Sequence, residues 1–407
     1  MMSLFKKSRR KVYLDHAAAT PLDSRVLSAM VPYLKDEFGN ASALYALGVS
    51  ARKAIEDARA SVARVLRTTP DTIVFTSGGT EANNLAVRSV IPRSESSSDE
   101  ESLLARKHPH LITTTIEHDS VLQPIKQLER EGFEVTYLPV DSEGRVSVKS
   151  VSENLRSDTI LVSIMYANNE IGTIQPIAEI GREILKWRKN KNSPYPYFHT
   201  DACQAINYLS VAVDALHVDL MTFNASKIYG PKGVGGLYKR RGVEIATLLY
   251  GGGQEFGLRS GTENVAGIVG LGKAMEIAEE MKAKEVERVD ELQRFFWEKI
   301  ENEIKNAQLN GPVLGENRLV NNLNISFRGI EAEALVLYLD AKGIACSTGS
   351  ACSTSSALRS HVLEACGYSK ERIESSVRFT LGRGTTMGDI DYAVAVMRKV
   401  VNTLQRK

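Results

Sequence analysis

From residue 72 to residue 223, short apolar runs alternate with amphipathic or polar runs, and this alternation restricts the fold more than any other feature of the chain. The apolar runs have the length and composition of buried strands. They lie at residues 72–76, 111–115, 134–138, 159–165, 197–201 and 218–223. Strands that are joined through helices form a parallel or mostly parallel sheet with helices on both faces. The sequence therefore predicts an α/β fold, with functional side chains where the strands end.

The length and charge of the chain indicate a second domain and disfavour two classes of function. A chain of 407 residues is long enough for two domains, and its hydrophobic content of 43% is ordinary for a globular protein. The net charge of +2 does not favour a binder of nucleic acid or of membrane surfaces. A long charged helix, expected at residues 265–304 with a break, would lead from the sheet into a small C-terminal α+β domain.

The cysteines and the N-terminus indicate where the protein works. Four cysteines in a chain of this length are too few for a disulfide framework, so a reduced, cytoplasmic setting is expected. The sequence has no CxxC pair, and no metal site is expected. Residues 1–11 are basic but are not followed by an apolar stretch, and no run is long enough to span a bilayer. Neither a secretory signal nor a membrane anchor is therefore expected.

Polar residues follow several of the expected strands. Residues 77–84 form a glycine-rich turn that opens a helix, so backbone N–H groups and the helix dipole would face an anion, and Thr80 adds a hydroxyl. Taken alone, such a turn is more often only a turn. The other polar residues at strand ends are His118, Asn168, Asn169, Asp201, Gln204 and Lys227. Their shared position at one edge of the sheet favours a common site.

Lys227 stands just past the last of these strands and precedes a glycine-dense turn at residues 230–236. A lysine held among packed residues loses hydration, which favours the neutral amine that attacks a carbonyl, although a lysine with its ammonium in water is the commoner case. Lys227, a helix N-terminus for a phosphate and the strand-end carboxylate of Asp201 together meet the needs of pyridoxal 5'-phosphate. His118 could stack on its ring and move protons, but a lone histidine is more often structural.

Residues 345–356 are small and polar and surround Cys346 and Cys352. Such a segment does not build a core, and we expect a loop in which Cys352 is accessible. Accessibility and thiolate character decide the reactivity of a cysteine, so Cys352 is a candidate nucleophile. Cys366, on a helix face, and Cys203, beside Asp201, are expected to contribute to packing.

Taken in order, these motifs resemble those of the cysteine desulfurases, which are pyridoxal-phosphate enzymes of the class V aminotransferase fold. The matching segments are Tyr13-Leu-Asp-His-Ala-Ala-Ala-Thr-Pro21, Phe75-Thr-Ser-Gly-Gly-Thr-Glu81, Glu117-His118, Asn168-Asn-Glu-Ile-Gly172, Asp201-Ala-Cys-Gln204, Lys227-Ile-Tyr-Gly-Pro-Lys-Gly233, Arg259-Ser-Gly-Thr262, Gly349-Ser-Ala-Cys352 and Ser376-Val-Arg-Phe379. Most of them are weak individually, but together they are specific and extend over about residues 12–400. The long Cys352 segment resembles the group I branch, the housekeeping and nitrogen-fixation type.

The resemblance implies a fold-type I pyridoxal-phosphate transferase with a mostly parallel, seven-stranded sheet. A large cofactor-binding domain would span residues 15–262, and a small α+β domain of residues 1–14 and 263–407 would carry the catalytic loop at about 345–357. The implied reaction takes sulfur from L-cysteine, gives L-alanine and leaves a persulfide on Cys352 for iron–sulfur cluster assembly or tRNA thiolation. A sulfur-acceptor protein is therefore an expected partner, whereas nucleic acid and membranes are not.

The resemblance also implies roles for single residues. Lys227 would form the Schiff base with the cofactor, and Cys352 would attack the sulfur of the substrate. Asp201 would hold the pyridine nitrogen protonated, and Gln204 would contact the ring hydroxyl. His118 would stack on the ring and act in catalysis.

Further implied roles concern the substrate and the phosphate. Arg378 would bind the substrate carboxylate, and Asn169 would contact both substrate and cofactor. The residues expected at the phosphate are Gly79, Thr80, Asn224, Ser226 and, from the other subunit of a homodimer, Thr262. The chain departs from the family pattern here, because the family usually has Ser-x-His-Lys where this sequence has Asn224-Ala-Ser226-Lys227. We expect Ser226 and Asn224 to make the phosphate contacts that the histidine and the serine make in the family pattern.

Other interpretations compete with desulfurase activity. A pyridoxal-phosphate selenocysteine lyase, or an aminotransferase without persulfide transfer, would not depend on Cys352. A silent binding subunit would keep the fold without the chemistry, although the intact set of candidate residues argues against it. A nucleotide-binding protein is disfavoured because the sequence has neither a GxGxxG after the first strand nor a Walker-type loop.

Overall fold

The computed structural model describes residues 10–90, 109–349 and 359–405. Its centre is a seven-stranded sheet in the order β2-β8-β7-β6-β5-β3-β4. The strands are β2 (Ile73–Thr76), β3 (His110–Thr114), β4 (Glu134–Leu138), β5 (Thr159–Ser163), β6 (Tyr197–Asp201), β7 (Leu220–Asn224) and β8 (Gly235–Lys239). Strands β4, β3, β5, β6 and β7 are parallel neighbours, whereas β8 is antiparallel to both β7 and β2. The predicted mostly parallel, seven-stranded α/β sheet is confirmed.

Strand β8 was not predicted from the sequence as a strand, because its glycines indicated a turn. Two of these glycines permit a close approach within the sheet. A Cβ atom at Gly235 would lie 2.8 Å from backbone atoms of Gly78, and one at Gly236 would lie 2.4 Å from the Phe223 ring. Because β8 is antiparallel to both neighbours, β2 and β7 point in the same direction, so the turn after β2 lies at the same edge as the residues that follow β7.

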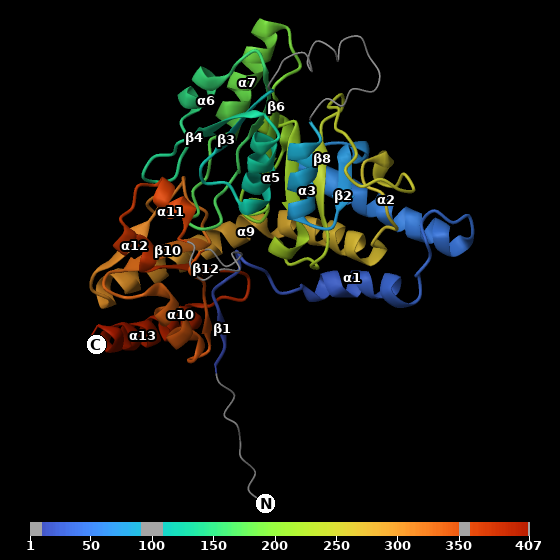
Figure 1. Ribbon diagram of the computed structural model, residues 1–407. Coiled ribbons are helices and arrows are strands. Elements are labelled where there is room, and N and C mark those ends of the chain that lie inside the picture. The colour runs from blue at the N-terminus through green and yellow to red at the C-terminus, as the bar shows by residue number, and fades with distance from the viewer. Residues whose placement is uncertain (1–9, 91–108, 350–358, 406–407) are drawn as a thin grey trace, which may run out of the picture.

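Helices cover both faces of the sheet (Figure 1). The helices of this part are α1 (Ser24–Lys35), α2 (Ala46–Leu66), α3 (Gly79–Arg88), α5 (Asp119–Arg130), α6 (Val148–Asn154), α7 (Ile177–Lys191), α8 (Val213–Leu216) and the start of α9 (Val265–Glu303). Apolar side chains of α3 and α5 pack on one face of the sheet, and those of α2, α6, α7 and α9 pack on the other. Both faces of the strands are therefore buried, which explains why the strands read as continuous apolar runs.

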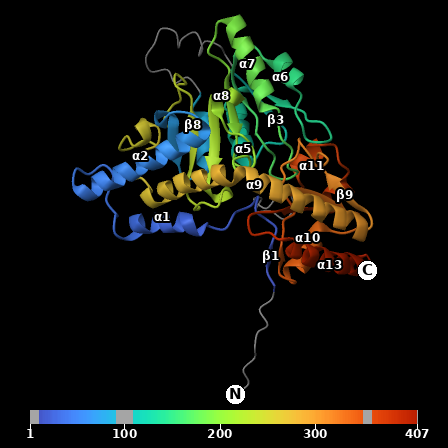
Figure 2. The ribbon, with the colours of Figure 1, turned by 180° about the vertical axis from the view of Figure 1, so that it is seen from behind.

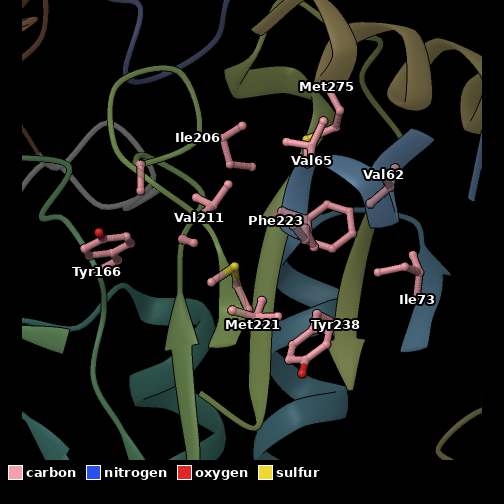
Figure 3. Packing of buried hydrophobic residues seen from close by; sticks show 14 of the residues in the cluster. Val62, Val65, Ile73, Tyr166, Ile206, Val211, Met221, Phe223, Tyr238 and Met275 are labelled. Carbon is pink, nitrogen blue, oxygen red and sulfur yellow. The ribbon is translucent and has the colours of Figure 1, made fainter. Parts of the chain in front are cut away.

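The second face holds the larger apolar cluster (Figure 3). Met221 and Phe223 of β7 and Tyr238 of β8 belong to the same cluster as Val62 of α2 and Met275 of α9. Successive residues of a strand alternate between the two clusters, as Leu220 and Met221 do. This packing fixes the register of β7 and so the position of the residues that follow it.

The C-terminal part has its own apolar cluster around an antiparallel sheet in the order β12-β10-β9 and a short parallel pair, β1-β11. Its elements are β1 (Val12–Tyr13), β9 (Ala307–Asn310), β10 (Asn322–Phe327), α10 (Ala332–Asp340), β11 (Ile344–Ala345), α11 (His361–Ala365), α12 (Lys370–Glu374), β12 (Ser376–Thr380) and α13 (Met387–Leu404). This arrangement is the expected small α+β unit. The predicted domain limits at residues 14/15 and 262/263 stay a prediction.

Helix α9 joins the two parts without interruption, so the break predicted within residues 265–304 is wrong. Its first half contributes Leu271 and Met275 to the cluster of the large sheet, and its second half contributes Leu292 and Phe296 to the C-terminal cluster. Figure 2 shows α9 running from α1 and α2 to β9 and α13. Packing of both halves against apolar clusters keeps the helix continuous.

Two further observations concern expectations from the sequence. Among the described residues, no helix combines the length and the apolar composition that crossing a membrane would require. The polar, Ser/Glu-rich stretch of residues 94–107 and the candidate nucleophile Cys352 lie outside the described residues.

Candidate active site

A cavity of about 760 Å³ opens at the edge of the sheet where the parallel strands end. Its walls come from the turns after β2, β3, β5, β6 and β7, from residues 17–18 of the N-terminal segment, and from β12. The sequence-predicted site residues that line it are Gly79, Thr80, His118, Asn169, Asp201, Gln204, Asn224, Lys227 and Arg378. The structure thus brings together nine residues from six separate segments of the sequence.

Three other predicted residues are placed differently. Ser226 does not line the cavity; its backbone N–H donates to the Asn224 side chain, and its carbonyl accepts from Thr20. Thr262 is exposed and does not line the cavity of its own chain. Cys352 lies outside the described residues, but Gly349, which precedes its segment, lines the cavity. The roles predicted for Ser226, Thr262 and Cys352 stay predictions.

Lys227 ends a short 3-10 helix (Ala225–Lys227) that directly follows β7. The buried neighbours Ala225 and Ile228 fix this turn, and Asn207 donates a hydrogen bond of 2.8 Å to the Lys227 carbonyl. The side chain is part-buried, and Nζ donates to the carbonyl of Ala18, 2.5 Å away. The amine therefore lies at a packed cavity wall, and this arrangement differs from that of a strand-edge lysine in bulk water.

Gly79 begins helix α3 at the cavity. A Cβ atom at Gly79 would lie 2.9 Å from the Cys203 sulfur and 3.5 Å from the side-chain nitrogen of Asn224, so a larger residue would close this corner. The first N–H groups of a helix have no partner within the helix and attract anions, as does the helix dipole. Thr80 and the Asn224 amide lie beside them at the same cavity. This corner has the donors that a phosphate group requires.

The Asp201 carboxylate lies at the end of β6, only 8% exposed. It accepts hydrogen bonds from the Asn83 side chain, at 2.7 Å, and from the Cys203 backbone N–H, at 2.9 Å. Two donors hold the carboxylate in a fixed orientation. Gln204 lies one turn further on, and its side chain donates to the carbonyl of Ala17.

Arg378, on β12, is 2% exposed, and its guanidinium reaches the cavity from the C-terminal part. It forms an ion pair of 2.7 Å with Asp15 and donates to the carbonyl of Asn169 at 2.9 Å. Its Nε atom is buried and has no hydrogen-bond partner among the described residues. An oriented guanidinium at the cavity suits a carboxylate ligand.

His118 is the N-cap residue of α5, and its Nδ1 atom accepts from the backbone N–H of Ser120. The preceding residue, Glu117, is fully buried at the same cavity. Burial raises the pKa of Glu117 to about 8, and the charge of Asp201 acts in the same direction. Hydrogen bonds from Thr114 and from the Met165 backbone oppose this rise without cancelling it.

The sequence did not assign a role to four residues at or beside this cavity: Asp15, Asn83, Glu117 and Ser120. A signal existed for Asn83, because it shares the buried face of α3 with Gly79, Ala82 and Ala86 and is the polar residue on that face. Asp15 and Glu117 stood within motifs that resembled the family, but their partners come from distant parts of the sequence. Ser120 carried no signal apart from its position after His118.

The donors and acceptors of the cavity fit pyridoxal phosphate. They comprise an amine on Lys227, a carboxylate on Asp201, the helix N-terminus at Gly79 and a ring on His118, arranged around one space. The glycine at residue 79 leaves open the corner that the phosphate would need.

The family model of class V aminotransferases matches residues 12–393. The cysteine desulfurase IscS of Dictyoglomus turgidum is 47% identical over 397 residues, which cover 98% of this chain and 96% of that protein. The chain belongs to the cysteine desulfurase family. The IscS of Methanosarcina thermophila is 45% identical, with 97% of this chain and 93% of the relative covered.

Solved structures agree with this family. A NifS-like protein has a TM-score of 0.87 and 36% identity, and the match covers 97% of this chain and 100% of that one. A second structure, described as SspA in complex with cysteine, has a TM-score of 0.76 and 36% identity, and covers 91% and 99% of the two chains. The predicted class V fold, sulfurtransferase class and pyridoxal-phosphate cofactor are confirmed by this membership.

Proposed function

We propose that this desulfurase takes L-cysteine as its substrate, releases L-alanine and receives the sulfur on Cys352 as a persulfide. The observation that supports the proposal most directly is the cavity in which Lys227, Asp201 and Arg378 meet. The first two suit pyridoxal phosphate, and the third suits the carboxylate of an amino acid. The likeness to SspA, whose structure is described as a complex with cysteine, supports the choice of substrate.

Each side chain has a defined task in this proposal. Lys227 would hold the cofactor covalently, Asp201 would pair with its ring nitrogen, and Gly79, Thr80 and Asn224 would hold its phosphate. When bound, the cofactor supplies an electron sink for the carbon atoms of the substrate. Arg378 would orient the substrate carboxylate, because its guanidinium is itself held by Asp15 and by the Asn169 carbonyl.

The sulfur step balances without an outside oxidant. The Cys352 thiolate attacks the thiol sulfur of the substrate, and an S–S bond forms as the Cβ–S bond breaks. The electron pair of the broken bond stays with the substrate carbon, which takes one proton and leaves as the methyl group of alanine. Cys352 is left as a persulfide, and a reductant or an acceptor protein then removes its outer sulfur.

Alanine formation from cysteine tests the proposal. The purified holoenzyme should form alanine in repeated turnovers when a thiol reductant is present, and sulfide should appear in equal amount. Cys352→Ser should lose both products while keeping the absorbance of the bound cofactor, and Cys346→Ser serves as the matched control. Alanine formation that survives in Cys352→Ser would refute the role of Cys352 and favour a lyase, for which selenocysteine is the substrate to test next.

The homodimer with a shared site belongs to the same proposal. Thr262 is exposed and does not line its own cavity, which supports a contact with the phosphate bound by a second copy. The same loop exposes the large apolar side chains of Leu249, Tyr250 and Phe256. Light scattering should give the mass of a dimer, and Thr262→Ala should weaken cofactor retention in the dimer. A monomer with full cofactor retention would overturn this part.

We infer the sulfur acceptor from the chemistry of the persulfide. It would be a carrier or cluster-scaffold protein that presents a nucleophilic thiol to Cys352. Labelled sulfur from cysteine should pass from Cys352 to such a thiol when the two proteins are mixed. A persulfide that reacts with small thiols but with no candidate carrier would contradict this part of the proposal.

A further inference from the structure

We propose that a hydrogen-bonded chain from Asp201 through Asn83 and Ser120 fixes the tautomer of His118, so that its ring carries its proton on Nε2. The distances along this chain are 2.7 Å from Asp201 to Asn83, 2.8 Å from Asn83 to Ser120 and 2.7 Å from Ser120 to His118. Asn83 and Ser120 become positioning residues for His118, beyond the residues that the family resemblance assigned.

The direction of the chain is set at Asp201. An ionised carboxylate accepts hydrogen bonds and cannot donate them, so the Asn83 amide must turn its NH₂ group toward Asp201. The same NH₂ group has a second hydrogen to donate, and its nitrogen lies 2.8 Å from the Ser120 hydroxyl oxygen. Asn83 is completely buried, so water does not compete for this amide. The Ser120 oxygen therefore accepts from Asn83.

The Ser120 hydroxyl then has its own hydrogen to give. The hydroxyl oxygen lies 2.7 Å from Nδ1 of His118, and because a hydroxyl that accepts from Asn83 has one hydrogen and one further lone pair, this contact alone fits either direction. The backbone N–H of Ser120 points to the same Nδ1 atom at 3.1 Å. A backbone N–H is always a donor, so this contact makes Nδ1 an acceptor, and the Ser120 hydroxyl then donates to the same atom.

Two donors on Nδ1 leave Nε2 as the protonated nitrogen of the neutral ring, because the hydrogen bond at one ring nitrogen sets the state of the other. Protonation at Nδ1 would place a hydrogen against the Ser120 N–H and would cost that hydrogen bond, although the Ser120 hydroxyl could accept from the protonated nitrogen. His118 would therefore act toward a cavity ligand as a hydrogen-bond donor through Nε2–H, and not as a base at that atom. The donor role of His118 toward a cavity ligand rests on the proposed function, whereas its tautomer does not.

Nitrogen-15 spectra of the histidine side chains in the holoenzyme test the tautomer directly. The chain has seven histidines, and His118→Gln identifies the signals of His118 by their loss. We expect a pyridine-type signal for Nδ1 and a pyrrole-type signal for Nε2. A pyrrole-type Nδ1 would overturn the proposal whether or not the protein proves to be a desulfurase.

The variant Ser120→Ala tests the chain while leaving Asn83 and Asp201 in contact. It removes the shorter of the two bonds to Nδ1, so the Nδ1 signal should move toward that of a pyridine-type nitrogen with fewer hydrogen bonds. Ser120→Thr keeps a hydroxyl and should restore the wild-type signal. An Nδ1 signal that is the same in Ser120→Ala as in the wild type would show that the hydroxyl does not bond to the ring.

Two replacements of His118 distinguish a role as hydrogen-bond donor from a role as base. Glutamine keeps an N–H donor but has no basic nitrogen, whereas phenylalanine keeps a flat ring for stacking but has no donor. If His118 acts as a donor, His118→Gln should retain at least about fivefold more alanine formation than His118→Phe, since one hydrogen bond contributes about 1 kcal/mol. Equal losses in the two variants would contradict the donor role.

Discussion

The buried carboxyl group of Glu117 should make the stability of this protein depend on pH, and the variant Glu117→Gln should remove that dependence. Glu117 is fully buried, and its Oε2 atom has no hydrogen-bond partner among the described residues. Burial raises its pKa from 4.5 to about 8. The folded protein therefore holds a proton on Glu117 over a range of pH in which the unfolded chain has already released it.

The sign of the effect follows from this difference in proton binding. Between about pH 4.5 and about pH 8 the folded state binds more protons than the unfolded state, so the free energy of unfolding falls as the pH rises. With these two pKa values, the loss between about pH 6 and about pH 9 is about 2.5 kcal/mol. The contribution is complete only below about pH 4.5; a little over half of it remains at about pH 6, and it is nearly absent at about pH 9.

Glutamine has the shape of the neutral carboxylic acid and does not titrate. The side-chain oxygen of the new glutamine can still accept from the Thr114 hydroxyl and the Met165 backbone N–H, which are the donors that Glu117 uses. Relative to the wild type, Glu117→Gln should therefore gain about 2.5 kcal/mol of stability on going from about pH 6 to about pH 9. Other titrating groups are common to both proteins and cancel in the difference.

Guanidinium unfolding of the two holoenzymes at both pH values gives this difference, provided that the slopes of the unfolding curves agree. The exposed Glu153→Gln variant controls for the loss of one negative charge and should follow the wild type at both pH values. The reasoning would be refuted if wild type and Glu117→Gln kept a constant difference in stability from about pH 6 to about pH 9.

Three further outcomes are expected. Lys227→Ala should lose the visible absorbance of the covalently held cofactor, and absorbance that persists would assign the cofactor to another lysine. Arg378→Ala should raise KM for cysteine by roughly tenfold or more, because a charge-assisted contact to a carboxylate is worth at least about 1.4 kcal/mol, and an unchanged KM would remove Arg378 from the substrate site. Gly235→Ala places a Cβ atom 2.8 Å from the Phe223 carbonyl oxygen and should lower the unfolding temperature, whereas Gly384→Ala, with open space around it, should not. Equal unfolding temperatures for these two glycine variants would contradict the close packing of β8.

The sequence predicted those elements whose pattern is local. Apolar runs marked the parallel strands, and the residues that follow them, such as Asp201 and Lys227, were correctly placed at one edge of the sheet. Strand β8 was missed because its glycines serve close packing, a tertiary requirement that a single sequence does not display. The continuity of α9 was missed for a similar reason, since each half is stabilised by a different apolar cluster.

Within the site, the sequence correctly predicted that most of the candidate ligand-binding residues meet at one place, but it gave no role to residues that contact other side chains. Asp15 has its partner, Arg378, more than 300 positions away, and no spacing in the sequence connects the two. Asn83 and Ser120 carry residue types that are common in turns and helices, so their roles depend on the distances found in the fold. The residues that hold the ligand-binding side chains in place therefore depend largely on packing, whereas the ligand-binding side chains themselves can be recognised in the sequence motifs.

The N-terminal segment, residues 15–20, makes supporting contacts with both parts of the molecule. Its carbonyl groups accept from Lys227 and Gln204 of the large sheet, whereas its N–H and carboxylate groups bond to Thr380 and Arg378 of the C-terminal part. One short run of backbone thus contacts both the amine proposed to hold the cofactor and the arginine proposed to hold the substrate. Ala17 and Ala18 lack long side chains, so the contacts with Lys227, Gln204 and Thr380 are made through the backbone itself. A shift of the C-terminal part relative to the sheet would therefore disturb both groups together, which ties cofactor and substrate geometry to the packing of helix α9.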